Sequence, residues 1–258
     1  MNEKKADPII ETKDMTIRFG GHVAVDHVNL RIEPFVLKSI IGPNGAGKTT
    51  LFNLMTGQYR PTEGNVFLKG KDITRLNAVE RTRLGLGRSF QLTNIFPLLT
   101  VIENVRVAIQ SRKGFGLNFW RNYLHFSEVE DEAYSILQDV LLEEKWAVLA
   151  SALTHGEQRK LEIAILLALE PEILFLDEPT AGMGQEEVPA ILEILQKIKE
   201  TESRTMLLVE HKMDMIMTLS DTIAVLQEGR LIADGDPVKI SESDAVQCAY
   251  LGGGAKRE

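Results

Sequence analysis

The chain has 258 residues, of which 44% are hydrophobic and 26% charged, and its formal net charge is -8. This composition is typical of a folded globular protein with a substantial core, and the negative charge argues against general electrostatic binding to nucleic acid. The longest aliphatic run, Ile163 to Leu169, is far shorter than the roughly 20 apolar residues of a membrane-spanning helix, so we do not expect the chain to cross a membrane alone.

Short β-branched or aliphatic runs alternate with stretches in which apolar residues have helical spacing. Because parallel neighbours need crossover connections, this alternation predicts an α/β core with a mainly parallel sheet. The turn at Lys69 to Asp72 predicts additional antiparallel sheet within residues 7 to 87. The predicted strands are Ile9 to Arg18, Val36 to Ile41, Ile173 to Leu176, Met206 to Val209 and Ile223 to Leu226.

The stretch from Val101 to Leu169 has mainly helical spacing and predicts a helical subdomain inserted into the core. A glycine and aromatic segment, Gly114 to Trp120, interrupts it; we expect a packed loop there, with a partner-binding patch as the alternative. The only cysteine, Cys248, is expected to be a small packing residue. The predicted helices are Val101 to Gln110, Glu128 to Val140 and Gly156 to Leu169.

A phosphate loop follows the second predicted strand and precedes an apolar helix. Its glycines allow several backbone N–H groups to point inward, and the helix N-terminus adds positive potential. Lys48 is predicted to contact the β and γ phosphates, and the Thr49 hydroxyl to bind Mg²⁺. The sequence therefore predicts a nucleoside triphosphate site formed by Gly42, Pro43, Asn44, Gly45, Ala46, Gly47, Lys48, Thr49 and Thr50.

Two acidic residues end the predicted strand Ile173 to Leu176. A strand that delivers carboxylates beside a phosphate loop creates a site for a metal ion and a water molecule. We expect Asp177 to hold Mg²⁺ and Glu178 to orient and polarise the attacking water.

The segment Leu153-Thr154-His155-Gly156-Glu157 opens an apolar helix, and Thr154 with Glu157 has the spacing of a capping box. It resembles the signature of ABC ATPases, usually Leu-Ser-Gly-Gly-Gln. That resemblance implies a P-loop NTPase (RecA-like) core with an antiparallel β subdomain and an inserted helical subdomain. It also implies a head-to-tail dimer with a second ABC ATPase, identical or paralogous, in which Thr154, Gly156 and Glu157 contact the ATP of the partner. Helix capping without ATP contact is the alternative.

Three further residues match family positions. Phe19 is similar to the aromatic residue that stacks on adenine, and His211 to the histidine that contacts the γ-phosphate. Gln91 corresponds to the glutamine that reaches the metal ion and the attacking water. The segment Gln91 to Glu103 would face a membrane permease.

The sequence also departs from the family pattern at three positions. His155 replaces a usual glycine, Glu157 a usual glutamine, and Gly184 stands where many relatives have an aspartate that couples the two sites. These changes motivate the alternative of a catalytically silent nucleotide-binding partner.

The stretch Asp177 to Met183, the aromatic segment Phe115 to Phe126 and the ending Ala249-Tyr250-Leu251-Gly252 resemble ATPases of branched-chain amino acid importers. The alternatives are urea or short-amide importers, lipopolysaccharide export, and soluble ABC ATPases that remodel DNA or ribosomes. The resemblance implies a peripheral position on the cytoplasmic face of the cell membrane and an extracytoplasmic substrate-binding protein in the complex, with no nucleic acid.

These predictions imply one ABC ATPase domain. It would span residues 7–254, with the nucleotide-binding core in 7–90 and 170–240, the helical subdomain in 91–169 and a tail in 241–258.

Overall fold

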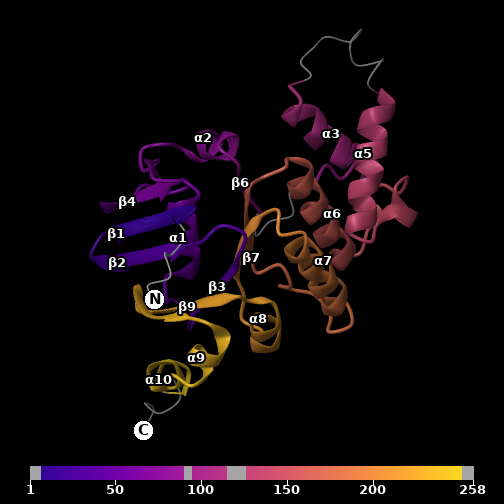
Figure 1. Ribbon diagram of the computed structural model, residues 1–258. Helices are drawn as coiled ribbons and strands as arrows, with labels where there is room; N and C mark the ends of the chain where they lie inside the picture. The colour runs from indigo at the N-terminus through magenta and orange to yellow at the C-terminus, as the bar shows by residue number, and fades with distance from the viewer. Residues whose placement is uncertain (1–6, 90–94, 115–125, 252–258) are drawn as a thin grey trace.

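The computed structural model describes residues 7–89, 95–114 and 126–251. Two sheets and a group of helices build the fold (Figure 1). The strands are β1 Ile10–Phe19, β2 His22–Ile32, β3 Leu37–Ile41, β4 Glu63–Leu68, β5 Lys71–Asp72, β6 Leu86–Arg88, β7 Ile173–Asp177, β8 Thr205–Val209, β9 Thr222–Gln227 and β10 Arg230–Gly235. The helices are α1 Lys48–Met55, α2 Ala78–Arg83, α3 Val101–Arg112, α5 Phe126–Asp139, α6 His155–Ala168, α7 Val188–Glu200, α8 Met213–Leu219, α9 Pro237–Ser241 and α10 Asp244–Leu251, with 3₁₀ turns at Glu143–Lys145 and Ala150–Ala152.

The central sheet has six strands in the order β10-β9-β3-β8-β7-β6. Every pairing in it is parallel except that of β10 with β9. The predicted mainly parallel sheet is confirmed. Its order places β3, β8 and β7 side by side, so the loops that follow these three strands share one edge of the sheet.

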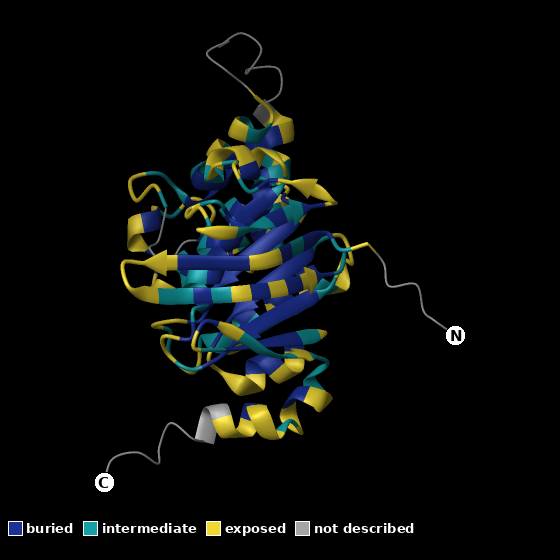
Figure 2. Ribbon diagram, turned by 90° about the vertical axis from the view of Figure 1, so that its left-hand side faces the viewer, coloured by how far each residue is buried: buried dark blue, intermediate teal, exposed yellow. Residues whose placement is uncertain are grey.

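Alternating side chains divide the core into two halves. On β7, Ile173 and Phe175 pack with α1 and the antiparallel sheet, whereas Leu174 and Leu176 pack against the helices on the other side. Strands buried on both faces tend to be apolar runs, and this made β7 and β8 predictable, whereas β3 also buries Lys38 and Ser39. Figure 2 shows the buried residues running through the centre of the molecule, with exposed residues alternating along strands at its surface.

A second sheet, with the order β2-β1-β4-β5, is entirely antiparallel. Its apolar side chains, such as Ile10 and Val28, share one core with Phe52 of α1 and Phe175 of β7. The rings of Phe52 and Phe175 meet edge to face with centroids 5.3 Å apart. The predicted antiparallel sheet is confirmed, and α1 lies against its buried side.

Helices α3, α5 and α6 pack on one another and share a core with α7 and with one face of the central sheet. Figure 1 shows α3 and α5 standing together beyond the sheet, with α6 nearer to it. Thr100 opens α3 with a capping box formed with Glu103. All three predicted helices are present, with ends shifted by one or two residues, whereas residues 115–125 lie outside the described part.

Arg81 anchors the end of α1, the helix that follows the phosphate loop. Its guanidinium lies in the core and donates 2.7 Å hydrogen bonds to the carbonyls of Leu54 and Met55, which end that helix. Burial lowers the pKa of Arg81 to about 10, so the side chain stays a cation at neutral pH. A cation at a helix C-terminus also interacts favourably with the helix dipole.

The C-terminal helices α9 and α10 cover β9 and β10 through Ile240 and Val246. Cys248 lies on the exposed side of α10, so the expectation of a packing cysteine is wrong. The face of this short helix that packs inward is occupied by Val246, which leaves Cys248 toward solvent. Among the helices of the described residues, none is long and apolar enough to cross a bilayer.

Candidate functional site

The predicted site residues gather where the three central strands end. The phosphate loop follows β3, Asp177 ends β7 and Glu178 comes directly after it, and His211 follows β8. Because β7 and β3 both pair with β8, these three loops are neighbours at one edge of the sheet. This edge is where open α/β sheets bind ligands.

The phosphate loop requires glycine where it approaches other backbone. Gly42 and Gly47 have φ angles of 152° and 97°, a region that side chains strongly disfavour. A Cβ at Gly42 would lie 2.1 Å from the carbonyl oxygen of Leu226, and one at Gly47 would lie 2.4 Å from that of Ala24. These two glycines therefore let the loop curl against β9 and β2.

Lys48 begins α1 and is 6% exposed. Its Nζ donates hydrogen bonds to the carbonyls of Gly42, at 2.7 Å, and Pro43, at 3.1 Å. Burial lowers the pKa of Lys48, and the charges of Glu178 and Asp177 partly oppose that shift. The amine is thus held inside the loop, close to both carboxylates, while Thr49 and Thr50 lie half-buried in the first turn of α1.

Asp177 is fully buried at the end of β7. Its Oδ2 accepts a 3.1 Å hydrogen bond from Nη2 of Arg88, and its Oδ1 has no hydrogen-bond partner among the described residues. Burial raises the pKa of Asp177, and the nearby Arg88 opposes that effect.

A buried carboxylate oxygen without a partner, near the hydroxyl-bearing start of α1, is a suitable donor for Mg²⁺. Such ions take one or two protein oxygens and complete their coordination with water and phosphate. Within the described residues no group of three or more His, Cys, Asp or Glu side chains is arranged to hold a metal ion. Asp177 and Thr49 therefore fit an ion shared with a nucleotide.

The carboxylate of Glu178 contacts the imidazole of His211, as that of Asp177 contacts Arg88. Nε2 of His211 lies 2.9 Å from Oε1 of Glu178, although the two residues are 33 positions apart. Glu178 has a left-handed φ of 48°, which a residue with a Cβ adopts at a cost in energy. Its N–H donates to the carbonyl of Val209 at 2.8 Å, which fixes the turn after β7 against β8.

Glu210, which was not predicted from the sequence, joins the loop after β7 to the loop after β8. Its buried carboxylate accepts hydrogen bonds from the N–H and the hydroxyl of Thr180, at 3.1 and 2.5 Å, and from the N–H of His211, at 2.9 Å. A glutamate that directly follows the buried strand β8 was the available signal. Arg88 and Arg159 were also missed, and both contact the residues that end β7.

The predicted capping box at the start of α6 is confirmed. The Thr154 side chain accepts from the N–H of Glu157, and Oε2 of Glu157 accepts from the N–H of Thr154 at 2.9 Å. The other oxygen of Glu157 pairs with Lys145. Burial disfavours the charged form of Glu157, but Lys145 and the Thr154 N–H outweigh it and lower the pKa of Glu157. Its charge is therefore balanced within the chain.

The model of the ABC transporter family matches residues 25–181, which contain the phosphate loop, the capped segment at Thr154 and the pair Asp177 and Glu178. The chain belongs to the ABC transporter family. The match covers the phosphate loop and the turn after β7, and it ends before the loop that carries His211.

Two relatives of this ABC protein are similar over nearly their full lengths. The high-affinity branched-chain amino acid transport ATP-binding protein LivG of Escherichia coli K12 is 39% identical over 255 residues, which are 96% of this chain and 99% of LivG. The corresponding protein BraF of Pseudomonas aeruginosa is 40% identical over 252 residues, which are 95% of this chain and 98% of BraF.

Solved structures of ABC cassettes have the same fold. An ATP-binding cassette of an ABC transporter in its ADP conformation superposes with a TM-score of 0.81 at 27% identity, over 95% of this chain and 99% of that one. A dimeric cassette in a post-hydrolysis state bound to ADP and Pi has a TM-score of 0.74 at 28% identity, over 88% of this chain and 98% of that one. The expected P-loop NTPase core is confirmed.

The other residues that match the ABC family pattern in sequence, or depart from it, are Phe19, His155, Gln91 and Gly184. Phe19 ends β1 with 47% of its surface exposed, and its ring meets that of Tyr59 edge to face at 5.5 Å. The exposed His155 lies against Gly182, where a Cβ would be 3.3 Å from the imidazole Cε1. Gln91 lies outside the described residues. Gly184 donates its N–H to Oε2 of Glu187 at 3.1 Å.

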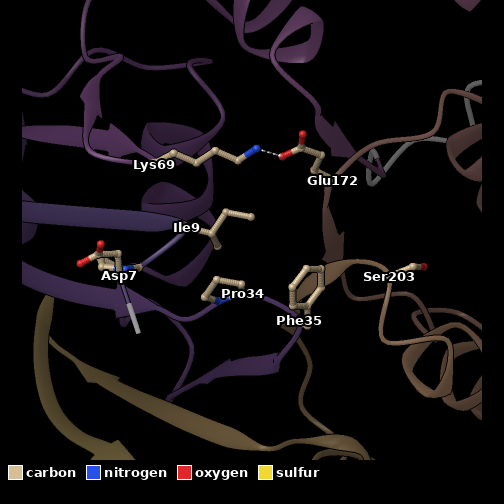
Figure 3. A pocket seen from close by; sticks show the side chains of 8 residues that line it. Asp7, Ile9, Pro34, Phe35, Lys69, Glu172 and Ser203 are labelled. Atoms are coloured by element: carbon tan, nitrogen blue, oxygen red, sulfur yellow. Dashed lines mark ion pairs between the residues drawn. The ribbon is translucent and has the colours of Figure 1, made fainter. Parts of the chain in front are cut away.

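A separate pocket lies at the other end of the central strands (Figure 3). Phe35 and Pro34 precede β3, and Lys69 reaches across to pair with Glu172 at 2.5 Å. It contains none of the predicted site residues. Because this pocket lies where β3 and β7 begin, and the phosphate loop and Asp177 lie where they end, it does not extend the nucleotide site.

Proposed function

We propose that this chain is the ATP-hydrolysing subunit of an importer for branched-chain or related amino acids. The observation that carries the proposal is the contact of Glu178 with His211 beside Lys48 and Asp177, at the edge of the sheet where the phosphate loop lies. Near-full-length similarity to LivG and BraF supports the substrate class.

Each residue of this edge has a distinct task in the proposed reaction. The phosphate loop and Lys48 bind the β and γ phosphates, and Phe19 offers an exposed ring to adenine. Glu178 orients a water molecule for attack on the γ-phosphorus and polarises it. His211 holds the Glu178 carboxylate and contacts the γ-phosphate. Mg²⁺, held by Asp177 and Thr49 with Gln91, supplies charge stabilisation for the phosphates when bound.

Two subunits would share two ATP molecules. Thr154, Gly156 and Glu157 at the start of α6 would contact the ATP held by the phosphate loop of a second ABC ATPase, identical or paralogous. The first turn of α6 is suited to this because its helix dipole favours negative charge nearby. The Lys145 ammonium beside Glu157 reduces the repulsion that an acidic residue would otherwise cause.

Transport would follow from closure of this dimer. The segment Gln91 to Glu103 would dock on a membrane permease, which places the chain on the cytoplasmic face of the cell membrane as a peripheral subunit. An extracytoplasmic substrate-binding protein would deliver the amino acid. Because ATP joins two surfaces that separate without it, nucleotide binding shifts the complex toward the closed state.

Reconstitution of the complete transporter in liposomes tests this function. We expect uptake of labelled leucine with ATP inside, and a loss of ATP hydrolysis by about 10² to 10⁴-fold in Glu178→Gln. Glu200→Gln, which removes one charge at the distant end of α7, is the control and should hydrolyse ATP normally. Unchanged turnover in Glu178→Gln would remove Glu178 from the mechanism, and uptake of urea without leucine would overturn the substrate class.

A further inference from the structure

Arg159 lies in the second turn of α6, with 8% of its surface exposed. Its Nη2 donates to the carbonyls of Asp177 and Glu178, both at 2.9 Å, and its Nε donates to the carbonyl of Pro179 at 3.1 Å. One guanidinium thus binds three successive carbonyls of the turn that carries both acidic residues. The planar fork of arginine suits this arrangement, which a lysine ammonium cannot reproduce.

The charge of Arg159 is balanced within α6. Its Nη1 lies 2.6 Å from Oε2 of Glu162, which is itself 8% exposed and one helical turn away. A buried cation would otherwise favour binding to the nearest carboxylate, including Asp177. With Glu162 as its ionic partner, Arg159 donates from Nε and Nη2 to backbone oxygens, while the carboxylate of Glu178 contacts His211.

The turn that Arg159 holds is a strained one. Glu178 is left-handed, with φ at 48°, and such a conformation persists only where the surroundings fix it. On the other side of the turn, the Glu178 N–H donates to Val209, and the Glu178 carbonyl also accepts from the N–H of Ala181 at 3.0 Å. Arg159 is therefore the side chain that reaches the turn from the helical layer.

We propose that Arg159 is a positioning residue for ATP hydrolysis: it holds the left-handed turn that directs the Glu178 carboxylate toward His211. The proposal rests on the function proposed above. Arg159 also connects two parts of the molecule. Thr154 caps the start of α6, and a shift of this helix would move the carbonyls of Asp177 and Glu178 through Arg159.

Arg159→Met and Arg159→Lys in the complete transporter test this proposal. We expect Arg159→Met to lower kcat by roughly 10 to 100-fold, because a small displacement of a catalytic group has an effect of that size, with the KM for ATP within about threefold. Arg159→Lys should recover only part of the loss. Lys160→Met removes the next charge of the same helix, whose Nζ contacts only the distant carbonyl of Leu141 at 3.5 Å in the described structure, and should hydrolyse ATP normally.

Titration of ATP-binding sites separates positioning from a purely structural role. A positioning residue leaves the fraction of protein that binds ATP unchanged and lowers turnover per bound ATP. A fall in the binding fraction with normal turnover per bound ATP would overturn the proposal, and so would normal kcat in Arg159→Met. If the Met variant fails to fold, Arg159→Lys decides the same question. Absence of both ATP hydrolysis and leucine uptake in the unsubstituted transporter would instead refute the function on which the proposal rests.

Discussion

Nη2 of Arg88 lies 3.1 Å from Oδ2 of Asp177, across a separation of 89 residues, and both side chains lie in the interior. Arg88 also donates to Asn53 at 2.5 Å and to Thr56 at 3.0 Å, both in or next to α1. The last residue of β6 therefore joins the helix of the phosphate loop to the predicted metal ligand.

Replacement of Arg88 by Met should destabilise the fold more than it changes ATP affinity. Asp177 would remain buried without its cation, and breaking one partner of a buried pair costs about 3 to 5 kcal/mol. Urea unfolding monitored by circular dichroism would measure this loss. The double variant Arg88→Met, Asp177→Asn should regain part of it, and an equal loss in the single and double variants would contradict the explanation.

Replacement of His211 by Ala should lower ATP hydrolysis by about 10² to 10³-fold, because it removes the group that holds the Glu178 carboxylate at 2.9 Å. ATP binding should remain, since the phosphate loop is untouched. Steady-state hydrolysis and nucleotide titration would measure both effects. His27→Gln, on the antiparallel sheet, is the matched control; a similar loss in that variant would mean that the effect is not local.

Two alanine substitutions in the phosphate loop should differ in their effect. At Gly47 a Cβ would lie 2.4 Å from the Ala24 carbonyl oxygen, whereas at Gly45, with φ at 81°, it would meet nothing within 4 Å. Both alanines require a left-handed backbone, at roughly 1 to 2 kcal/mol, but only Gly47→Ala adds a clash. Thermal unfolding and ATP titration should therefore show a larger loss for Gly47→Ala, and equal losses would exclude the contact with Ala24 as the cause.

The effect of Glu157→Gln should depend on pH. The folded-state pKa of Glu157 is lowered from its ordinary value of 4.5, so the carboxylate stabilises the fold above that value and loses this contribution as pH falls through the folded-state pKa. At pH 7 we expect the Gln variant to be less stable by about 0.5 to 1 kcal/mol. At a pH below the folded-state pKa of Glu157 the difference should vanish. Urea unfolding at both pH values measures the difference in stability between the two proteins. A difference that does not change with pH would contradict its assignment to the charge of Glu157.

The strands that could be predicted from sequence are those whose burial in the structure matches a run of apolar residues in the sequence. Strands β7 and β8 are buried on both sides and therefore appear as apolar runs, and in β3 apolar residues flank the buried Lys38 and Ser39. Strand β2 carries Asp26 and Asn29 in an irregular register with β1, so its sequence lacks such a run. Strand β6 has only three residues, too few to show a period.

The same distinction applies to the site. The phosphate loop, Asp177 and Glu178 are recognisable because their neighbours along the chain define them. Three residues that the sequence did not reveal bind residues far away along the chain, and their sequence neighbours give no sign of these contacts. They are Arg88, Arg159 and Glu210. The roles of Arg88 and Glu210 became visible when the sheet order placed β6, β7 and β8 side by side, and that of Arg159 when α6 packed against this sheet.

The close backbone contacts of Gly42 and Gly47 have a consequence for recognising inactive relatives. Both glycines fit against carbonyl oxygens of this chain itself, so the architecture demands them whether or not a nucleotide is consumed. A descendant that had lost hydrolysis would still be under pressure to keep them, and also to keep Lys48, whose buried amine bonds two carbonyls of the same loop. In comparisons within this family, Glu178 is therefore a better indicator of a working ATPase than the phosphate loop.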